Sequence, residues 1–286
     1  MVKFGNLRFE NLSPSISSMH GVLRVLANGM NLVPKLNRFP MHYLVVILLC
    51  CCGISCGDYE ENDTRLNDQD EATIPGYSES CKGKGVRVLQ GKNMVLFQFE
   101  PTCEYKVSRG IPSDDPMFYM NANFFTPGGK PLGLAIVNKK RFSSRCKGGG
   151  YFYVQDGRPK VSRACPRMTE FAAQTHLNWG IEEGRASYGG RQGEELTWRN
   201  LVGEDTQGRI LILVSGPAGQ LSVRDLIDEG KRVGMVNAIL FDAGSSVDYA
   251  FQSGNCAESF KVLPNLLGEL SGYGTPPIYI AIYEGR

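Results

Sequence analysis

The sequence of 286 residues has little histidine, little tryptophan and no long apolar run. Of its three histidines only His176 lies beyond residue 56, and no CxxC or CxxxxH spacing occurs, so a zinc site is not expected. No EF-hand loop is present, and the DAGSSVD stretch around Asp242 does not fit the Gly-x-Ser-x-Gly pattern of a nucleophilic serine. We therefore expect no metal and no other cofactor. The one exception would be Ca²⁺, for which Asp242 and Asp248 offer the oxygen ligands that this ion prefers.

An excess of charge of either sign is absent too. The chain has 31 Lys and Arg against 29 Asp and Glu, a formal net charge of +2. No stretch of sequence mixes dense basic residues with aromatic ones as a nucleic-acid groove would, so nucleic acid is not expected as a partner. With 42% hydrophobic residues the chain can bury a substantial core, and one domain of about 200 residues would be ordinary.

The N-terminal region has the features of a targeting segment. Lys35 and Arg38 precede the apolar run Leu44–Cys52, which is too short to cross a membrane because a spanning helix needs about 20 apolar residues. The next residues, Gly53-Ile54-Ser55-Cys56, look like a bacterial lipoprotein signal in which Cys56 accepts the lipid. A plain signal peptide cut nearby is the alternative.

We therefore expect residues 1–56 to be a leader, with Met30 and Met41 available as later starts. The mature protein should be exported to the cell envelope or periplasm and anchored to a membrane by lipid. Residues 57–80 are acidic and polar and cannot bury enough surface to fold alone, which predicts a disordered tether. The folded domain should then span residues 81–286.

Export also permits disulfide bonds. Five cysteines lie in the predicted domain: Cys81, Cys103, Cys146, Cys165 and Cys256. Sequence does not fix connectivity. We expect the pairs Cys81–Cys103 and Cys146–Cys165, with Cys256 left unpaired.

Short apolar or alternating runs bounded by Gly, Pro and Asn recur through the domain and predict strands. Asp156-Gly157 suits a tight turn and predicts a hairpin. The predicted strands are MVLFQFE (94–100), MFYMNANFF (117–125), LGLAIV (132–137), GYFYVQDG (150–157), RILILVSG (209–216), NAILFDAG (237–244) and IYIAIYE (278–284).

One segment has helical periodicity instead. Ser222 can serve as N-cap, Asp225 lies in the first turn, apolar residues recur at helical spacing, and Gly234 follows the end. Together with the runs at 209–216 and 237–244 this helix forms a strand-helix-strand unit of the length that a parallel crossover requires. The predicted fold class is α+β: a single sheet-rich mixed α/β domain with one strand-helix-strand unit carrying the C-terminal motif.

Asp242 stands at the end of the last strand of that unit, in FDAGSS (241–246). Asp is rare in strands, and a buried carboxylate needs partners or loses its charge. The carboxyl end of a strand is where sites of α/β type gather ligands, which favours a functional role. The alternative is that Asp242 caps the turn that follows.

Three stretches resemble motifs of the phosphodiester glycosidase domain family: MNANFFTPGGKPLGLAI (120–136), WRNLVGEDTQGRILILVSG (198–216) and FDAGSSVDY (241–249). Their order and spacing carry the resemblance, which extends from about Met94 to Tyr283. It implies hydrolysis of the glycosidic bond of a sugar-1-phosphodiester. Bacterial members are often exported and linked to exopolysaccharide metabolism, so the implied partner is a glycan or sugar phosphate.

The resemblance also suggests roles for residues. Asp242 is the expected principal carboxylate, and Arg199 the expected phosphate ligand because a guanidinium fork binds phosphate through paired hydrogen bonds. His176 is a candidate proton carrier near neutral pH. The expected substrate-binding residues are Asn121, Asn123, Gly133, Gly203, Gly244, Ser245 and Ser246.

Each of these assignments has an alternative. The asparagines and glycines also suit turns, Arg199 suits a strand start, and His176 suits a structural role. Trp179 and Trp198 either stack on a sugar or pack in the core. Ala243 stands where the family prefers Gly, and the His176 segment departs from its Gly-Pro pattern. The competing function is therefore a catalytically inactive, glycan-binding envelope lipoprotein of the same fold.

Overall fold

A computed structural model describes residues 73–126, 128–145, 148–175, 179–187, 194–216, 219–262 and 276–285 of the chain. All of them belong to one compact unit, residues 66–286. Within the described residues no helix is long and apolar enough to cross a membrane. The predicted leader, Cys56 and His176 lie outside the described residues.

The described chain is built mainly of short strands, with one α-helix and one short 3₁₀-helix. The elements, in chain order, are β1 (Ser78–Gly83), β2 (Val86–Gln90), β3 (Met94–Phe99), β4 (Glu104–Arg109), β5 (Phe118–Asn121), β6 (Ala135–Val137), β7 (Lys140–Ser143), β8 (Tyr151–Gln155), β9 (Arg158–Ser162), β10 (Phe171–Gln174), β11 (Trp179–Glu182), β12 (Arg185–Ala186), β13 (Asn200–Glu204), β14 (Ile210–Ser215), α1 (Val223–Arg232), β15 (Asn237–Leu240), η2 (Gly244–Ser246), β16 (Asp248–Ser253), β17 (Cys256–Lys261) and β18 (Ile278–Tyr283).

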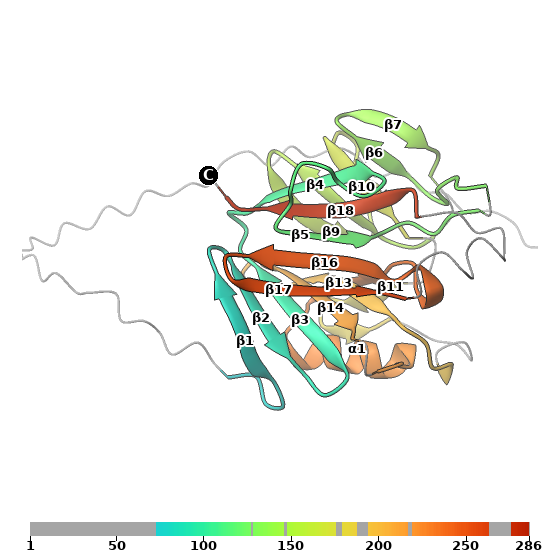
Figure 1. Cartoon of the computed structure of the whole chain (residues 1–286). Helices are drawn as coiled ribbons and strands as arrows, with labels where there is room; N and C mark the ends of the chain where they lie inside the picture. Colours follow the sequence, from blue (N-terminus) through green and yellow to red (C-terminus); the bar gives the residue numbers. More distant parts are fainter. Residues whose placement is uncertain are drawn as a thin grey trace, which may run out of the picture. The chain divides into compact units, whose positions relative to one another are not determined.

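The strands form three antiparallel sheets (Figure 1). Sheet I has the order β1-β2-β3-β14-β13-β15-β11-β12, sheet II the order β17-β16-β5-β18-β4, and sheet III the order β7-β6-β10-β8-β9. Sheet III lies against the others through β9, which approaches β13 and β15, and through β6 and β10, which approach β4. The sheet-rich part of the predicted fold class is confirmed. The described fold is mainly β, however, because only one crossover is helical.

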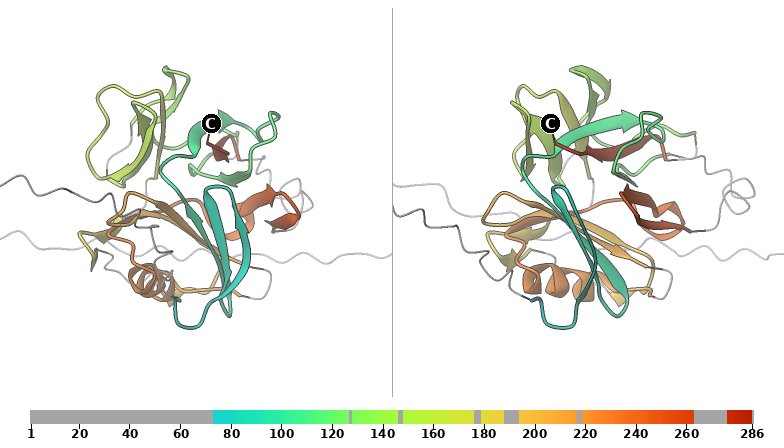
Figure 2. Two further views of the ribbon diagram at one scale, coloured as in Figure 1. Left: turned by 90° about the vertical axis from the view of Figure 1, so that its left-hand side faces the viewer. Right: turned by 60° about the vertical axis from the view of Figure 1, so that its left-hand side comes forward.

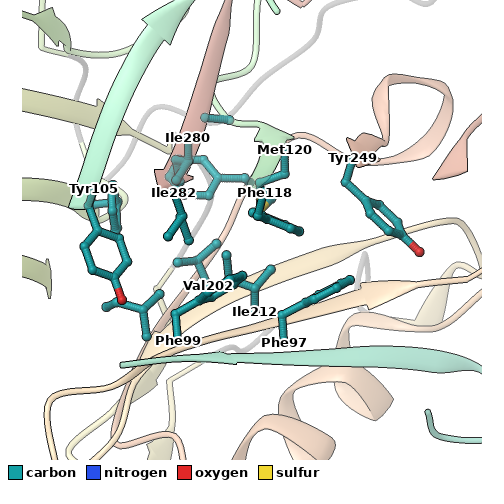
Figure 3. Close-up of a cluster of buried hydrophobic side chains, with 14 of the residues drawn as sticks. Phe97, Phe99, Tyr105, Phe118, Met120, Val202, Ile212, Tyr249, Ile280 and Ile282 are labelled. Atoms are coloured by element: carbon teal, nitrogen blue, oxygen red, sulfur yellow. The ribbon is translucent and has the colours of Figure 1, made fainter. Parts of the chain in front are cut away.

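The main core lies between sheets I and II, and the inner face of sheet III extends it. Phe97 and Phe99 of sheet I point toward Phe118 of sheet II, with ring centroids 4.9 and 5.2 Å from the Phe118 ring (Figure 3). Burial of such aromatic side chains is a dominant contribution to stability. This core fixes how the ends of β5 and β15, from different sheets, meet.

Helix α1 covers the other face of sheet I and lies on the side away from sheet III (Figure 2). Ser222 caps it by accepting a hydrogen bond from the Asp225 amide at 3.0 Å, as predicted. Leu226 and Ile227 are buried against sheet I. Strands β14 and β15 both pair antiparallel with β13 and so run parallel to each other, as the crossover prediction requires.

The predicted hairpin at Asp156-Gly157 joins β8 to β9. Asp156 has φ +52° and Gly157 has φ +73°. A two-residue hairpin turn that matches the twist of its strands requires positive φ at both central residues. Asp-Gly adopts these angles with little backbone strain. This local prediction is confirmed.

The predicted disulfide pairing is wrong. Cys81 of β1 is bonded to Cys256 of β17, while Cys103 and Cys165 are free thiols and Cys146 lies outside the described residues. The bond joins sheets I and II across 175 residues of sequence, which proximity along the chain does not reveal.

The start of the folded part also precedes the predicted boundary at Cys81. Strand β1 begins at Ser78, and Ile74 and Tyr77 pack against the core between α1 and sheet I. These residues were expected in the tether because the segment as a whole is polar. The two apolar side chains, Ile74 and Tyr77, attach the C-terminal end of the predicted tether to the domain.

Candidate active site

Asp242 lies just beyond the end of β15, where the ends of strands from two sheets meet. Its amide donates a hydrogen bond of 3.0 Å to the carbonyl of Ala122, which directly follows β5. The residue is only 7% exposed. Asp242 therefore lies at the end of a strand, as predicted. The backbone that follows β5 contacts the backbone of Asp242.

Two buried asparagines hold the Asp242 backbone in place. Asn121 and Asn200 both donate to the Asp242 carbonyl, at 3.1 and 2.8 Å. The side-chain oxygen of Asn121 accepts from the Asp248 amide at 3.1 Å, and that of Asn200 from the Phe241 amide at 3.2 Å. We call Asn121 and Asn200 the asparagine clamp. It fixes the segment on both sides of the carboxylate.

The surroundings of the Asp242 carboxyl group change its acidity. Burial raises the pKa of Asp242 to about 7. Hydrogen bonds donated by the Ser246 side chain and the Ala243 backbone lower the pKa and offset part of that effect. The Ala243 amide lies 3.0 Å from Oδ1. A carboxyl group with this pKa exchanges its proton near neutral pH, as general acid-base catalysis requires.

The turn after Asp242 has a defined shape. Gly244 has φ +68°, which favours glycine, and its amide donates to the Trp198 carbonyl at 2.8 Å. That amide is therefore bound within the protein, and the predicted role of Gly244 in substrate binding stays a prediction. Ser246 bonds the carboxyl group, whereas Ser245 is exposed. The turn thus brings one of the two predicted serines to the site.

Asn123 begins a second hydrogen-bond network, one residue beyond Ala122, whose carbonyl accepts from the Asp242 amide. Its side-chain nitrogen donates to the carbonyls of Leu132 and Leu134, at 3.3 and 3.2 Å, and so binds the segment around Gly133. Its side-chain oxygen is buried and has no partner among the described residues. Leaving a buried acceptor unpaired costs about 1–3 kcal/mol, which makes this atom a candidate ligand contact.

Arg199 is buried at the start of β13, next to the clamp residue Asn200. Its guanidinium donates to the carbonyls of Leu221 and Glu195, at 2.8 and 2.7 Å. These bonds connect the segment before β13 to the residue before the helix cap. Its role in binding phosphate stays a prediction.

Gly203 and Asp248 have other contacts. Gly203 is near the far end of β13, where a side chain would collide with Met235, so glycine permits close packing there. Its role in substrate binding stays a prediction. Asp248 is buried and accepts from Tyr279 at 3.0 Å, while Lys261 lies 3.2 Å from the same oxygen. Among the described residues no cluster of three His, Cys, Asp or Glu could hold a metal ion.

The two tryptophans differ. Trp179 is buried in the main core, where its ring fills the space that a side chain at Gly150 would occupy. Trp198 is half-buried, and its ring centroid lies 6.3 Å from that of Phe260. Its carbonyl holds the Gly244 turn, so Trp198 is the tryptophan beside the site.

Sequence reasoning missed two residues that build the site, Asn200 and Gln174. Asn200 follows Arg199 in the quoted motif but was not singled out. Gln174 is fully buried; its side chain accepts from the Leu134 amide at 2.9 Å and donates to the Gly148 carbonyl at 3.0 Å. A polar residue at the end of an apolar strand was the available signal.

Fold and site together define a β-sheet protein with a buried carboxylate where two sheets meet. The profile of the phosphodiester glycosidase family matches residues 116–266, which include Asp242, Arg199 and both clamp residues. The chain belongs to the phosphodiester glycosidase family.

Two solved structures are similar to the chain. The catalytic domain of zebrafish N-acetylglucosamine-1-phosphodiester alpha-N-acetylglucosaminidase, auto-inhibited by its pro-peptide, is 13% identical with a TM-score of 0.52, covering 73% of this chain and 81% of that chain. A hypothetical protein from Synechocystis is 11% identical with a TM-score of 0.46, covering 69% of this chain and 62% of that chain. No curated protein matches the chain.

Proposed function

We propose that the protein hydrolyses the glycosidic bond of a sugar-1-phosphodiester, with Asp242 as its principal carboxylate. The observation that carries the proposal is the position of Asp242: a buried carboxyl group with a pKa of about 7, held by the asparagine clamp, inside the segment that matches the family profile. The named activity of the zebrafish relative supports the same bond type.

The reaction breaks the bond between the anomeric carbon and the bridging oxygen. That oxygen leaves with the phosphate as a phosphomonoester, while water supplies the hydroxyl group of the released sugar. Because a phosphomonoester is a good leaving group, little acid assistance is needed. The ionised Asp242 carboxylate either stabilises the oxocarbenium-like transition state or activates the water.

The remaining residues bind and orient the substrate in this proposal. The unpaired side-chain oxygen of Asn123 accepts a hydrogen bond from a sugar hydroxyl, which would give this buried acceptor a partner. Arg199 binds the phosphate, and the Gly244–Ser246 turn borders the sugar. His176 is a further proton carrier. We also propose that the protein is exported, anchored by lipid at Cys56, and acts on an envelope glycan or exopolysaccharide.

The second candidate function is glycan binding without turnover. It is favoured by Ala243 in the position where the family prefers glycine and by the altered segment around His176. The two functions differ in what Asp242 does, since binding alone does not need its carboxylate.

The test is turnover. Purified full-length protein is incubated with a panel of sugar-1-phosphodiesters at pH 8, and free reducing sugar is followed. We expect turnover that is lost by at least about 100-fold in Asp242→Asn, the size of effect typical of a group acting in the transition state. Asp228→Asn, an exposed aspartate on α1, is the matched control and should retain full activity. Equal rates for Asp242→Asn and the control would contradict the proposal, and glycan binding without turnover would favour the second function.

A further inference from the structure

Basic residues are unevenly distributed along the chain. Residues 128–175 contain ten of the 31 Lys and Arg but only two of the 29 Asp and Glu, Asp156 and Glu170. The net charge of the whole chain is therefore near zero although this segment is strongly basic. This segment forms sheet III and its connecting loops, at the top of Figure 1.

The basic side chains of this segment face solvent. All nine whose positions are described are exposed. Three have acidic neighbours, because Lys139 lies 3.3 Å from Glu170, Lys160 lies 3.5 Å from Glu204, and Arg163 lies 2.8 Å from Glu182. The other six form no ion pair with any described residue: Lys130, Lys140, Arg141, Arg145, Arg158 and Arg167. Fixed like charges without partners favour an anionic ligand.

The sheet arranges some of these residues in a row. Its inner face packs Phe152 into the main core, so the alternate residues form the outer face. Strand register places five outer-face residues side by side across the five strands: Lys160, Tyr153, Ala172, Ile136 and Arg141. A cation thus stands at each edge, with an aromatic ring and aliphatic groups between them. The fold creates a combination of basic and apolar groups that no stretch of sequence displays.

Two hollows open on this outer face. One, of about 620 Å³, is lined by Arg145, Arg163, Tyr151 and the Gly148-Gly149 pair. The other, of about 530 Å³, is lined by Lys139, Arg141 and Arg167, by the carboxylates of Asp156 and Glu170, and by Ile136. Each hollow therefore combines at least two cations with apolar surface. Sugar rings pack on apolar or aromatic side chains, and phosphates bind guanidinium groups.

The first hollow is connected to the candidate active site. The Gly148 carbonyl in its lining accepts from Gln174, whose side chain accepts from the Leu134 amide, and the Leu134 carbonyl accepts from Asn123. Three consecutive residue contacts thus link the hollow to Asn123, which follows Ala122, the residue whose carbonyl accepts from the Asp242 amide. The Gln174 and Asn123 side chains that make these contacts are buried, so the loop that lines the hollow is held at a fixed position relative to Asp242.

We propose that the outer face of sheet III is the docking surface for a polyanionic phosphoglycan, a glycan whose sugars are joined through repeated phosphodiesters. The face holds several phosphates of the polymer while one linkage reaches Asp242. This inference rests on the proposed function and specifies its substrate as polymeric. Because the surface contacts several phosphates of one polymer, its contribution to binding affinity increases with the length of the polymer and decreases as the salt concentration rises.

The test variant combines Arg141→Gln, Arg145→Gln and Arg167→Gln, three exposed residues without ion pairs among the described residues. The control combines Lys92→Gln, Arg185→Gln and Lys231→Gln, which are exposed, lie outside sheet III and change the net charge equally. KM is measured on poly(glucose 1-phosphate) and on the methyl phosphodiester of glucose 1-phosphate. In the test variant, KM for the polymer should rise about tenfold, as expected for the loss of three exposed contacts. KM for the small substrate should change by less than about twofold. The control variant should leave both values unchanged.

An equal change on both substrates, or none on the polymer, would overturn the docking surface while leaving the proposed function intact. A binding measurement tests the docking surface separately from the proposed hydrolysis, because it needs no turnover. Full-length protein is titrated with poly(glucose 1-phosphate), neutral dextran, anionic phospholipid vesicles and duplex DNA at low and high salt. Polymer binding that is lost in the test variant supports docking even if no diester is hydrolysed. Tighter binding to vesicles or DNA than to the polymer overturns it.

Discussion

Asp242 illustrates how a single residue is made reactive at a cost in stability. Its carboxyl group is 7% exposed, and its pKa is raised to about 7 because burial disfavours the charged form. The hydrogen bonds from Ala243 and Ser246 favour the charged form but do not restore an ordinary pKa. An electrostatic cost concentrated at one side chain is typical of functional sites.

The stability cost has a definite sign and pH range. The folded pKa of about 7 lies above the unfolded value of 3.8, so the folded state binds more protons between these values and its stability falls as pH rises through them. At pH 8 the cost should be on the order of 1–4 kcal/mol. Asp242→Asn removes the titration, so urea unfolding should show a more stable variant at pH 8 and little difference at pH 4. A variant that is less stable than the parent at pH 8 would contradict the raised pKa.

The same ionisation should control activity. If the reaction uses the Asp242 carboxylate, kcat/KM rises with pH through about 7 and then levels off, because this ratio reports the free enzyme. The profile is measured from pH 5 to pH 9 on one small phosphodiester. A ratio that falls across this range would indicate that Asp242 acts as an acid instead.

Asn200 acts at the scale of secondary-structure elements, since it connects β13 to the end of β15. Asn200→Ala removes bonds to the Phe241 amide and the Asp242 carbonyl, both buried. We expect the free energy of unfolding to fall by about 1–3 kcal/mol and kcat to fall at least about tenfold, with a smaller change in KM. The matched control is Asn237→Ala, at the other end of β15, which removes the hydrogen bond that the Asn237 side chain accepts from the Glu183 amide. Equal kinetic effects from the two variants would rule out a positioning role.

Elements with local determinants were predictable from sequence. Helix α1 follows from its Ser222 cap and apolar spacing, and the β8–β9 hairpin follows from Asp156-Gly157, because both depend on neighbours in the chain. The position of Asp242 at a strand end followed in the same way. The asparagine clamp did not, since Asn200 reaches Asp242 through the pairing of β13 with β15, and Asn121 reaches it through the packing of sheet II against sheet I.

The whole molecule depends on a long-range covalent connection. The Cys81–Cys256 bond joins sheets I and II, and it differs from the expected pairs because the packing of one sheet against another cannot be read from sequence. Burial raises the pKa of the Cys103 thiol to about 11, so this thiol stays protonated and poorly reactive at neutral pH. The basic outer face of sheet III is a second property that emerges only when strands are assembled.

Loss of this disulfide should loosen the attachment between the two sheets. Because it closes a long loop, replacing both cysteines by serine should lower the free energy of unfolding by roughly 2–5 kcal/mol. Urea unfolding of Cys81→Ser/Cys256→Ser is compared with Cys165→Ser, which removes a free thiol and should change little. Peptide mapping without reduction should recover the Cys81–Cys256 pair. A peptide joining Cys81 to Cys103 would contradict the structure.

The central claim is that water attacks the sugar rather than the phosphate. Hydrolysis of a sugar-1-phosphodiester in water enriched in ¹⁸O distinguishes the two bonds by mass spectrometry of both products. We predict the label in the anomeric hydroxyl group of the released sugar and none in the phosphomonoester, with incorporation lost in Asp242→Asn. Label in the phosphomonoester would show cleavage of the phosphorus–oxygen bond and would contradict the assignment of this protein as a glycosidase.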